Sequence, residues 1–290
     1  MSSARDAWRL LEPLHAVVYF SPEPLAALDA AGYRGFWMGY FAGRAAPLGA
    51  VGAEVVHAAF YNFSFERVAK ALPAAWGFAP PEAALQARVE GAVAALRRQL
   101  AALADGPEVA RAAELAARAA DAVPLAGRVL GAANHALPPP DQPLARLWHA
   151  ATVLREHRGD GHIAALLAAG IEGRESHVFH ALSSGVPRQT YTVARDFTDD
   201  EWNRLTNALR DKGLAAAEGL TPDGVRLKAQ IEEQTDRLAA PAYEALTETE
   251  RHDLIRALRP LTHAVVAAGE IPLDSPMGLD LRPLSSGRER

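Results

Sequence analysis

Histidine is concentrated in the middle of this chain, where its imidazole groups lie beside acidic residues and glycines. Five of the ten histidines fall between positions 149 and 180. The densest group is His157, Asp160 and His162, which are separated by Gly159 and Gly161. Imidazole and carboxylate groups bind zinc, iron and manganese, and glycines allow the backbone to bend tightly. The pattern predicts a metal site at His157, Asp160 and His162, with a metal ion as the cofactor.

The same region also permits a helical interpretation without a metal. His149, Thr152 and Glu156 are three to four residues apart and would share one face of a helix. Arg155 or Arg158 would then hold the carboxylate of a small molecule through paired hydrogen bonds. A third interpretation involves no ligand, because the acidic and basic side chains of this region can form ion pairs where two helices meet.

Polar-tipped residues also accompany aromatic residues in the first quarter of the chain, where Phe36, Trp37 and Phe60 supply apolar surface. Ligand pockets are mostly apolar and contain a few convergent polar groups. We therefore expect a pocket between the two halves of the chain. The alternative is an ordinary core whose polar atoms are satisfied by hydrogen bonds. The residues predicted to bind the ligand are His15, Tyr19, Tyr40, Arg44, His57, Tyr61, Asn62, His149 and Arg155.

Composition excludes several other kinds of site. The chain has no cysteine, which rules out a disulfide scaffold, a thiolate zinc site and a cysteine nucleophile. The sequence contains no G-x-S-x-G elbow, P-loop or strand-to-helix G-x-G-x-x-G fingerprint. It has no run of 18 apolar residues and no signal peptide, so we expect no membrane partner and a cytoplasmic location. The net charge of −5 gives no support for an overall basic, nucleic-acid-binding surface.

The elements that position these residues are expected to be helices. Between positions 84 and 103 apolar residues recur every three or four positions, which is typical of an amphipathic helix. The three prolines at 138–140 form a stiff break. We predict a helical domain over residues 1–137, a second domain over 141–270 and an extended tail over 271–290.

Two short segments in the second domain carry a resemblance to a known family. The sequence Leu-Arg-Asp-Lys-Gly-Leu at 209–214 and Leu-Thr-Pro-Asp-Gly at 220–224 is similar to MarR-type winged-helix regulators. The resemblance implies a recognition helix over 201–212, a small β-hairpin wing over 215–219 and a dimerisation helix starting at Thr221. The fold class is then mostly α, with a helical domain followed by a MarR-like winged-helix domain. Over nearly its full length the chain also resembles an actinobacterial helix-turn-helix family of unassigned function, through segments 43–49, 60–63 and 154–162.

The recognition helix implied by this resemblance carries residues that can contact DNA. Asn203 and Asn207 can hydrogen-bond to base edges, and Arg204, Arg210 and Lys212 can neutralise phosphates. The surrounding segment 196–260 nevertheless holds nine Lys or Arg residues against fourteen Asp or Glu residues. This acidic balance also fits a winged helix that is used only for packing or dimerisation.

We therefore expect a homodimeric, ligand-responsive transcriptional regulator that binds a small molecule between its two halves and DNA through its winged helix. The alternative is a metal- or cofactor-dependent enzyme on a winged-helix fold that has lost DNA binding, with its site in the histidine-rich centre. A third interpretation is a pure interaction module. The direction in which the central histidines point, into a cavity or into a packed core, separates these interpretations.

Overall fold

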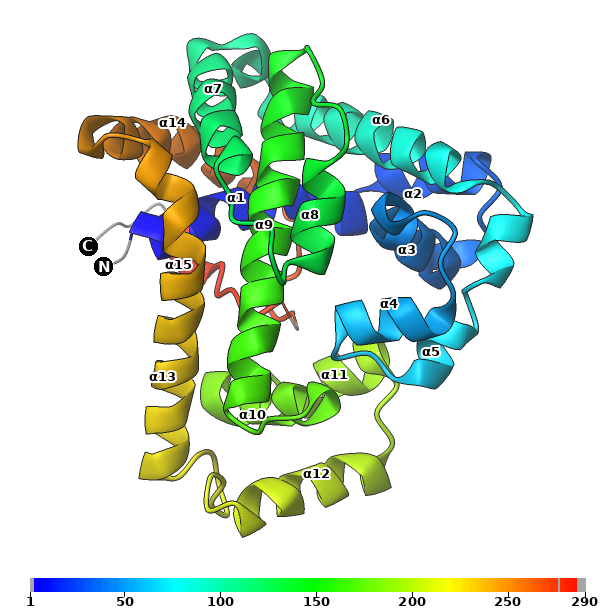
Figure 1. The fold of residues 1–290 in the computed structure, drawn as a ribbon, viewed down its shortest axis with the longest axis vertical. Coiled ribbons are helices and arrows are strands. Elements are labelled where there is room, and N and C mark those ends of the chain that lie inside the picture. The colour runs from blue at the N-terminus through cyan, green and yellow to red at the C-terminus, as the bar shows by residue number, and fades with distance from the viewer. Residues whose placement is uncertain (1–2, 276, 286–290) are drawn as a thin grey trace.

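The chain folds into helices joined by short loops in the computed structural model, which describes residues 3–275 and 277–285 (Figure 1). Alanine-rich sequence with regularly spaced apolar residues accounts for most of these helices, since alanine has the highest helix propensity. The α-helices of the first half are α1 (Ser3–Phe20), α2 (Pro22–Ala30), α3 (Gly35–Ala45), α4 (Ala53–Phe60), α5 (Phe65–Ala69), α6 (Pro81–Leu100), α7 (Pro107–Asp121) and α8 (Val129–His135). Those of the second half are α9 (Pro143–Ala168), α10 (Gly173–Ser184), α11 (Arg188–Arg195), α12 (Asp199–Asp211), α13 (Pro222–Ala239), α14 (Glu248–Ala267) and α15 (Arg282–Ser285).

Three clusters of buried apolar residues hold these helices together. The first cluster joins α1, α6, α7, α9 and α14 and extends to Leu281, so it draws on both sides of the proline break at 138–140. The second lies among α2 to α6 and α8. The third joins the end of α9 to α10, α11, α12 and α13. In Figure 1 the unit formed by α10, α11 and α12 lies at one end of the molecule and is connected to the rest by α9 and α13.

Helix α9 is buried on nearly every side, since 16 of its 26 residues are buried. Gly159 and Gly161 lie within this continuous helix, so the expectation that these glycines form a bent loop is wrong. Gly161 serves close packing instead, because a Cβ atom there would lie 3.3 Å from the Cβ of Leu238 and 3.2 Å from the Cζ of Arg128. A small residue is needed where helices approach this closely.

The expected β-hairpin wing is wrong, because the described residues contain no β-strand. Between α12 and α13 the chain makes a single antiparallel bridge from Ala215 to Leu220, closed by a hydrogen bond from Ala216 N to Gly219 O of 3.1 Å. One further backbone hydrogen bond, from Thr221 N to Leu214 O at 3.0 Å, crosses the turn where α13 begins, so the pairing ends there without forming strands. The mostly helical character that was predicted for this segment agrees with the structure, which has α12 and α13 here, but the predicted β-hairpin between these helices is absent from the described residues.

The C-terminal segment crosses the molecule as an ordered strap over its described part. Ser275, Leu279 and Leu281 are 4%, 6% and 0% exposed, so this segment covers part of the core. The end of the predicted extended tail, residues 286–290, lies outside the described residues.

Candidate functional site

Helices α11 and α12 form a helix-turn-helix, in which three residues, 196–198, join the two helices. Asp196 takes the left-handed conformation, with φ of +54°, and redirects the chain. Thr198 then caps α12, and its hydroxyl accepts a hydrogen bond of 3.2 Å from the backbone N–H of Glu201. This cap at Thr198 fixes where α12 begins.

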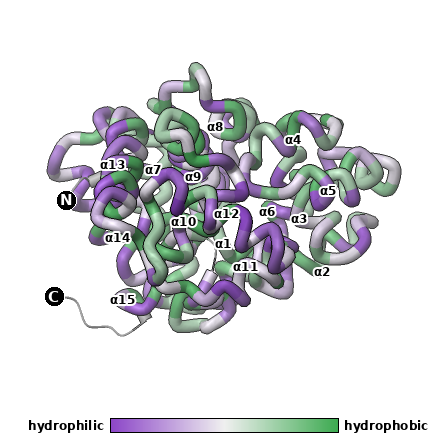
Figure 2. The backbone as a smooth tube through the Cα atoms, turned by 90° about the horizontal axis from the view of Figure 1, so that it is seen from below, coloured by the Kyte–Doolittle hydropathy of each residue, from purple (hydrophilic) through white to green (hydrophobic). Residues whose placement is uncertain are grey.

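A small aromatic core fixes α12 against its neighbours. Tyr191 of α11 is fully buried, and Phe197 and Trp202 are 3% and 7% exposed. The rings of Phe197 and Trp202 meet edge to face with centroids 5.2 Å apart. Leu205 and Leu209 continue the buried stripe along α12. Figure 2 shows hydrophilic residues alternating with hydrophobic ones along this helix, as expected for an element with one buried face.

Four of the five predicted DNA-contacting residues lie exposed on the outer face of α12, namely Asn203, Arg204, Asn207 and Arg210. Arg210 donates a hydrogen bond of 3.0 Å to the side-chain oxygen of Asn207, so these two side chains support each other.

Lys212, the fifth of these residues, has a structural partner. Its ammonium group donates to both carboxylate oxygens of Glu175, at 2.8 and 2.7 Å, and to the Gly170 carbonyl at 2.9 Å. Glu175 is only 1% exposed, so Lys212 neutralises a buried charge while its own side chain remains 39% exposed.

A cavity of about 520 Å³ lies between the helix-turn-helix unit and the N-terminal helices. This volume is within the range that accommodates a drug-sized ligand. One wall is aromatic and comes from α3 and the segment after α4. The opposite walls come from α9, α10, α11 and α13, and Met277 and Gly278 of the C-terminal strap line one side. The aromatic lining residues are Trp8, Tyr19, Phe20, Phe36, Trp37, Tyr40, Phe60, Tyr61, Phe63 and Phe179, together with the imidazole rings of His162, His177 and His180.

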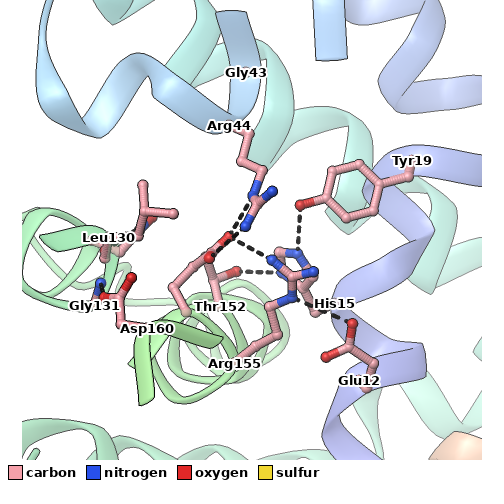
Figure 3. Close-up of polar contacts among 12 residues, drawn as sticks. Glu12, His15, Tyr19, Gly43, Arg44, Leu130, Gly131, Thr152, Arg155 and Asp160 are labelled. Atoms are coloured by element: carbon pink, nitrogen blue, oxygen red, sulfur yellow. Dashed lines mark hydrogen bonds and ion pairs between the residues drawn. The ribbon is translucent and has the colours of Figure 1, made fainter. Parts of the chain in front are cut away.

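Six of the nine residues predicted to bind a ligand line this cavity: Tyr19, Tyr40, Arg44, Tyr61, Asn62 and Arg155. A seventh, His15, lies directly behind Tyr19, with its Nε2 atom 3.0 Å from the Tyr19 hydroxyl (Figure 3). The remaining two lie outside the cavity lining. His57 packs edge-on against Phe65, and burial, followed by the charge of Arg88, lowers the pKa of His149 to about 4.

Glu156 is the centre of a buried ion network on the cavity wall (Figure 3). Its carboxylate accepts hydrogen bonds of 3.0 and 3.1 Å from Arg44 and one of 2.8 Å from Arg155. Arg155 also donates to Glu12 at 3.3 Å. Burial alone would raise the pKa of Glu156, but the charges of Arg155 and Arg44 outweigh it and the pKa falls well below its usual range. This network joins α3, in the first half of the chain, to α9.

A second charged network lies where α13 meets α9 and α1. Arg158 donates to Asp236 at 2.7 Å, and Lys228 donates to Glu232 at 2.7 Å. His162 shares a hydrogen bond of 2.9 Å with Thr235, and burial lowers the pKa of His162 to about 4. At neutral pH His162 is therefore an uncharged side chain beside these ion pairs.

The predicted metal ligands do not converge on one point. His157 packs against Gly131, at the back of α9, and the Asp160 carboxylate accepts a hydrogen bond of 2.9 Å from Gly131 N. His162 instead faces Thr235. Within residues 3–275 and 277–285 no group of three or more His, Cys, Asp or Glu residues is arranged to hold a metal ion. The reason is that the segment is helical, so positions 157 and 160 share the face toward Gly131 whereas position 162 lies on another face, toward Thr235.

Several residues of the cavity carried no recognisable signal in the sequence. Arg195 and His177 line it together with residues of the first half of the chain, such as Phe63, which lies more than a hundred positions away from either. The Nε2 atom of His177 has no hydrogen-bond partner among the described residues, although the side chain is only 3% exposed. Arginine at the end of a short helix is common on protein surfaces, so sequence alone did not mark Arg195 as a cavity residue.

Residues 4–272 of the chain match a helix-turn-helix family, and the chain belongs to this family. This membership points to DNA-binding regulation as the general class of function, in agreement with the geometry of α11 and α12. No curated protein and no solved structure matches the chain. In the part of the chain that the structure describes, none of the helices has the length and apolar character needed to cross a bilayer.

Proposed function

We propose that this protein is a ligand-responsive, DNA-binding transcriptional regulator in which α12 reads DNA and the cavity receives a small-molecule effector. One observation carries this proposal: the cavity and the helix-turn-helix share a wall. Val193, Ala194 and Arg195, at the end of α11, line the cavity, and the turn that leads into α12 begins at the next residue. A molecule in the cavity would therefore touch the element that positions the reading helix.

Arg174 of α10 provides the mechanical connection between the cavity wall and α12. Its guanidinium donates to the Arg195 carbonyl at 2.6 Å and to both carboxylate oxygens of Glu201 at 2.8 and 2.6 Å. It also lies 3.7 Å from the centre of the Phe197 ring. One side chain thus holds the end of α11, the turn and the first turn of α12, so a displacement of α11 would be passed to α12.

The turn is also tied to the N-terminal half of the chain. Asp196 forms an ion pair with Arg67, whose guanidinium lies over the ring of Trp37, a cavity residue. Tyr61 donates from its hydroxyl to the Ile171 carbonyl at 2.5 Å, directly before α10. These contacts support a mechanism in which ligand binding between the halves changes the orientation of the helix-turn-helix unit.

The charge of the reading face suggests a modest affinity for DNA. Asp199 and Asp200 are exposed at the start of α12, where they would repel phosphates, and phosphate contacts supply most of the salt-dependent affinity of DNA-binding proteins. We propose that two copies bind together as a homodimer, so that each contributes its own α12. The likeness to MarR-type regulators is retained for α12 and α13 only.

Fluorescence anisotropy with duplex DNA from upstream of the protein's own coding sequence tests DNA reading by α12. Asn203→Ala and Arg204→Ala should each weaken binding by about 1–3 kcal/mol if they contact bases. Arg256→Ala is the matched control, because Arg256 is 79% exposed on α14, and it should leave binding unchanged. Absence of salt-sensitive binding at micromolar protein, or an equal effect of all three substitutions, would contradict the proposal.

A further inference from the structure

Arg195 is the cavity residue whose charge the protein leaves without a partner. Its Nε atom has no hydrogen-bond partner, and its Nη1 atom donates only to the carbonyl of the adjacent Ala194 at 3.0 Å. No carboxylate of residues 3–275 or 277–285 forms an ion pair with it, and its guanidinium lies 4.4 Å from the centre of the Phe63 ring. Burial, opposed in part by Tyr40 and reinforced by Arg44, lowers the pKa of Arg195 to about 10. Arg195 is therefore still charged at neutral pH.

Each of the other cations that line the cavity forms an ion pair with an acidic residue. Arg44 and Arg155 share the carboxylates of Glu12 and Glu156. In the second network Arg158 and Lys228, together with Arg5 from outside the lining, share the carboxylates of Glu232 and Asp236.

Asp160, the remaining charged group of the lining, accepts from the Gly131 backbone and lies within electrostatic range of Arg128. Among the described residues, Arg195 is thus the lining cation that has no carboxylate partner. A partly buried charge of this kind is costly unless a ligand of opposite sign pairs with it.

Tyr19, another residue of the cavity wall, presents a hydrogen-bond acceptor to the cavity. The Thr152 hydroxyl donates to the Trp148 carbonyl at 2.9 Å, so it accepts from Nδ1–H of His15 at 2.9 Å. In that tautomer the His15 Nε2 atom is an acceptor, and it accepts the hydroxyl proton of Tyr19 at 3.0 Å. The Tyr19 oxygen therefore presents lone pairs, and no proton, to the cavity. A polar group of a ligand at this position must be a hydrogen-bond donor.

The wall near these two polar positions is aromatic, and most of its rings meet edge to face or tilted. Trp37, Tyr40 and Phe63 form contacting ring pairs, with centroids 5.6 Å apart for Trp37 and Tyr40 and also 5.6 Å for Tyr40 and Phe63. Phe36 packs on both Trp37 and Tyr40. A wall built of such rings favours an apolar, aromatic partner, because aromatic rings pack edge to face or offset against one another.

We infer that the effector is an amphipathic anion of drug-like size, with an apolar, aromatic body on the aromatic wall, one negative group paired with Arg195 and a hydroxyl or N–H group donating to Tyr19. This inference rests on the proposed function, because it takes the cavity to be the effector site. It also explains how occupancy reaches DNA, because the paired group sits on the last residue of α11.

Two fluorescent probes of matched shape test the inference. 8-Anilinonaphthalene-1-sulfonate has an aromatic apolar body, one anionic group and one N–H, and N-phenyl-1-naphthylamine is the same molecule without the anionic group. The wild-type protein should bind the anionic probe about ten-fold or more tightly than the neutral one, since a charge-assisted hydrogen bond contributes roughly that factor. Comparable affinity for both probes would overturn the inference, and this comparison needs no variant.

Substitutions at Arg195 test whether this residue causes the preference for the anionic probe. Arg195→Met should weaken the anionic probe about ten-fold and change the neutral probe by less than about two-fold, whereas Arg195→Lys should keep most of the anionic affinity. Arg256→Met is the control and should change neither, and circular dichroism should show that all variants remain helical. Unchanged anionic affinity in Arg195→Met, or equal losses in Arg195→Lys and Arg195→Met, would overturn the inference.

DNA binding measured in the same preparations separates the two proposals. Loss of anion selectivity with intact DNA binding would refute the ligand class and leave the regulator standing. Anion selectivity at Arg195 without any DNA binding would refute the regulator and leave the ligand class standing.

Discussion

Replacing Glu156 with Gln would remove the shared counter-ion of two buried arginines. Glu156 is 2% exposed and its carboxylate accepts three hydrogen bonds, two from Arg44 and one from Arg155. A Gln side chain has nearly the same shape but carries no charge, and its amide nitrogen would face guanidinium donors. The variant therefore keeps the packing and loses the electrostatic attraction between α3 and α9.

The expected cost is large for a single substitution. Breaking a buried ion pair by removing one partner costs about 3–5 kcal/mol, because the remaining charge stays buried without compensation. Arg155 retains Glu12 at 3.3 Å, whereas Arg44 has no second carboxylate among the described residues. We therefore expect a loss of about 3–5 kcal/mol in the free energy of unfolding at pH 7.

The pH dependence of this loss has a defined sign. The pKa of Glu156 is lowered in the folded protein, so its stabilisation is fully present above the ordinary glutamate pKa of about 4.3. It is lost as the pH falls through the lower folded pKa. The difference between wild type and Glu156→Gln should therefore be constant from about pH 5 to pH 8 and shrink below about pH 4.

Urea denaturation followed by circular dichroism measures this difference. Glu114→Gln is the matched control, because Glu114 is 55% exposed and pairs with Arg111 on the surface, where such a pair contributes under about 1 kcal/mol. A loss below about 1 kcal/mol for Glu156→Gln, or a loss equal to that of the control, would refute the assignment of Glu156 as the shared counter-ion.

Three further substitutions probe other parts of the structure. Gly173→Ala should destabilise the protein by about 1–3 kcal/mol, because a Cβ atom there would collide with the Tyr61 carbonyl; a neutral result in urea denaturation would contradict this close contact. Leu209→Ala should lower the free energy of unfolding by about 2–5 kcal/mol and abolish DNA binding, since Leu209 is fully buried on the inner face of α12; DNA binding equal to that of the wild-type protein, measured by anisotropy at 25 °C, would count against α12 as the reading helix. Burial raises the pKa of Asp160 to about 6, so the folded state holds this proton more tightly than the unfolded state and stability falls as the pH rises from about 4 to 6. Asp160→Asn should remove that slope and raise the free energy of unfolding at pH 7 by on the order of 1–3 kcal/mol, and an unchanged slope would be the contrary result.

The helix-turn-helix was predictable because its signals are local. Thr198 and Thr221 mark the starts of two helices through capping, and both hydroxyls accept the backbone hydrogen bonds that capping requires. The spacing of Trp202, Leu205 and Leu209 identifies the buried face of α12, and the exposed positions follow from it. The wing was not predictable in the same way, since a family resemblance implied it while the loop is too short to build it.

The cavity was predictable in part. Tyr19, Tyr40 and Arg44 stood out because polar tips among aromatic residues suggest a pocket, and the structure places all three on its wall. Their partners could not be derived, because His15 meets Thr152 across 137 positions of sequence and Arg44 meets Glu156 across 112. Such distant pairings depend on how the helices pack, which periodicity does not encode.

The expectation of a bent loop with converging histidines in the centre of the chain was wrong for a related reason. A helix that is buried all round shows no polar face, so α9 lacks the periodic pattern that identifies a surface helix. Its glycines then suggested a bend, and its histidines suggested a shared ligand. In the folded protein His157 and His162 fill separate interfaces with α8 and α13.

The enclosure of α9 also restricts how this protein can be divided or recombined. The helix places Leu147 and Trp148 in one hydrophobic core and Leu166 in another, so a cut anywhere near it exposes apolar surface on both fragments. Exchange of the DNA-reading end between relatives would have to carry α9 and its surrounding helices with it. New specificities are therefore expected to arise by point changes on the outside of α12 and inside the cavity, with the framework inherited as one piece.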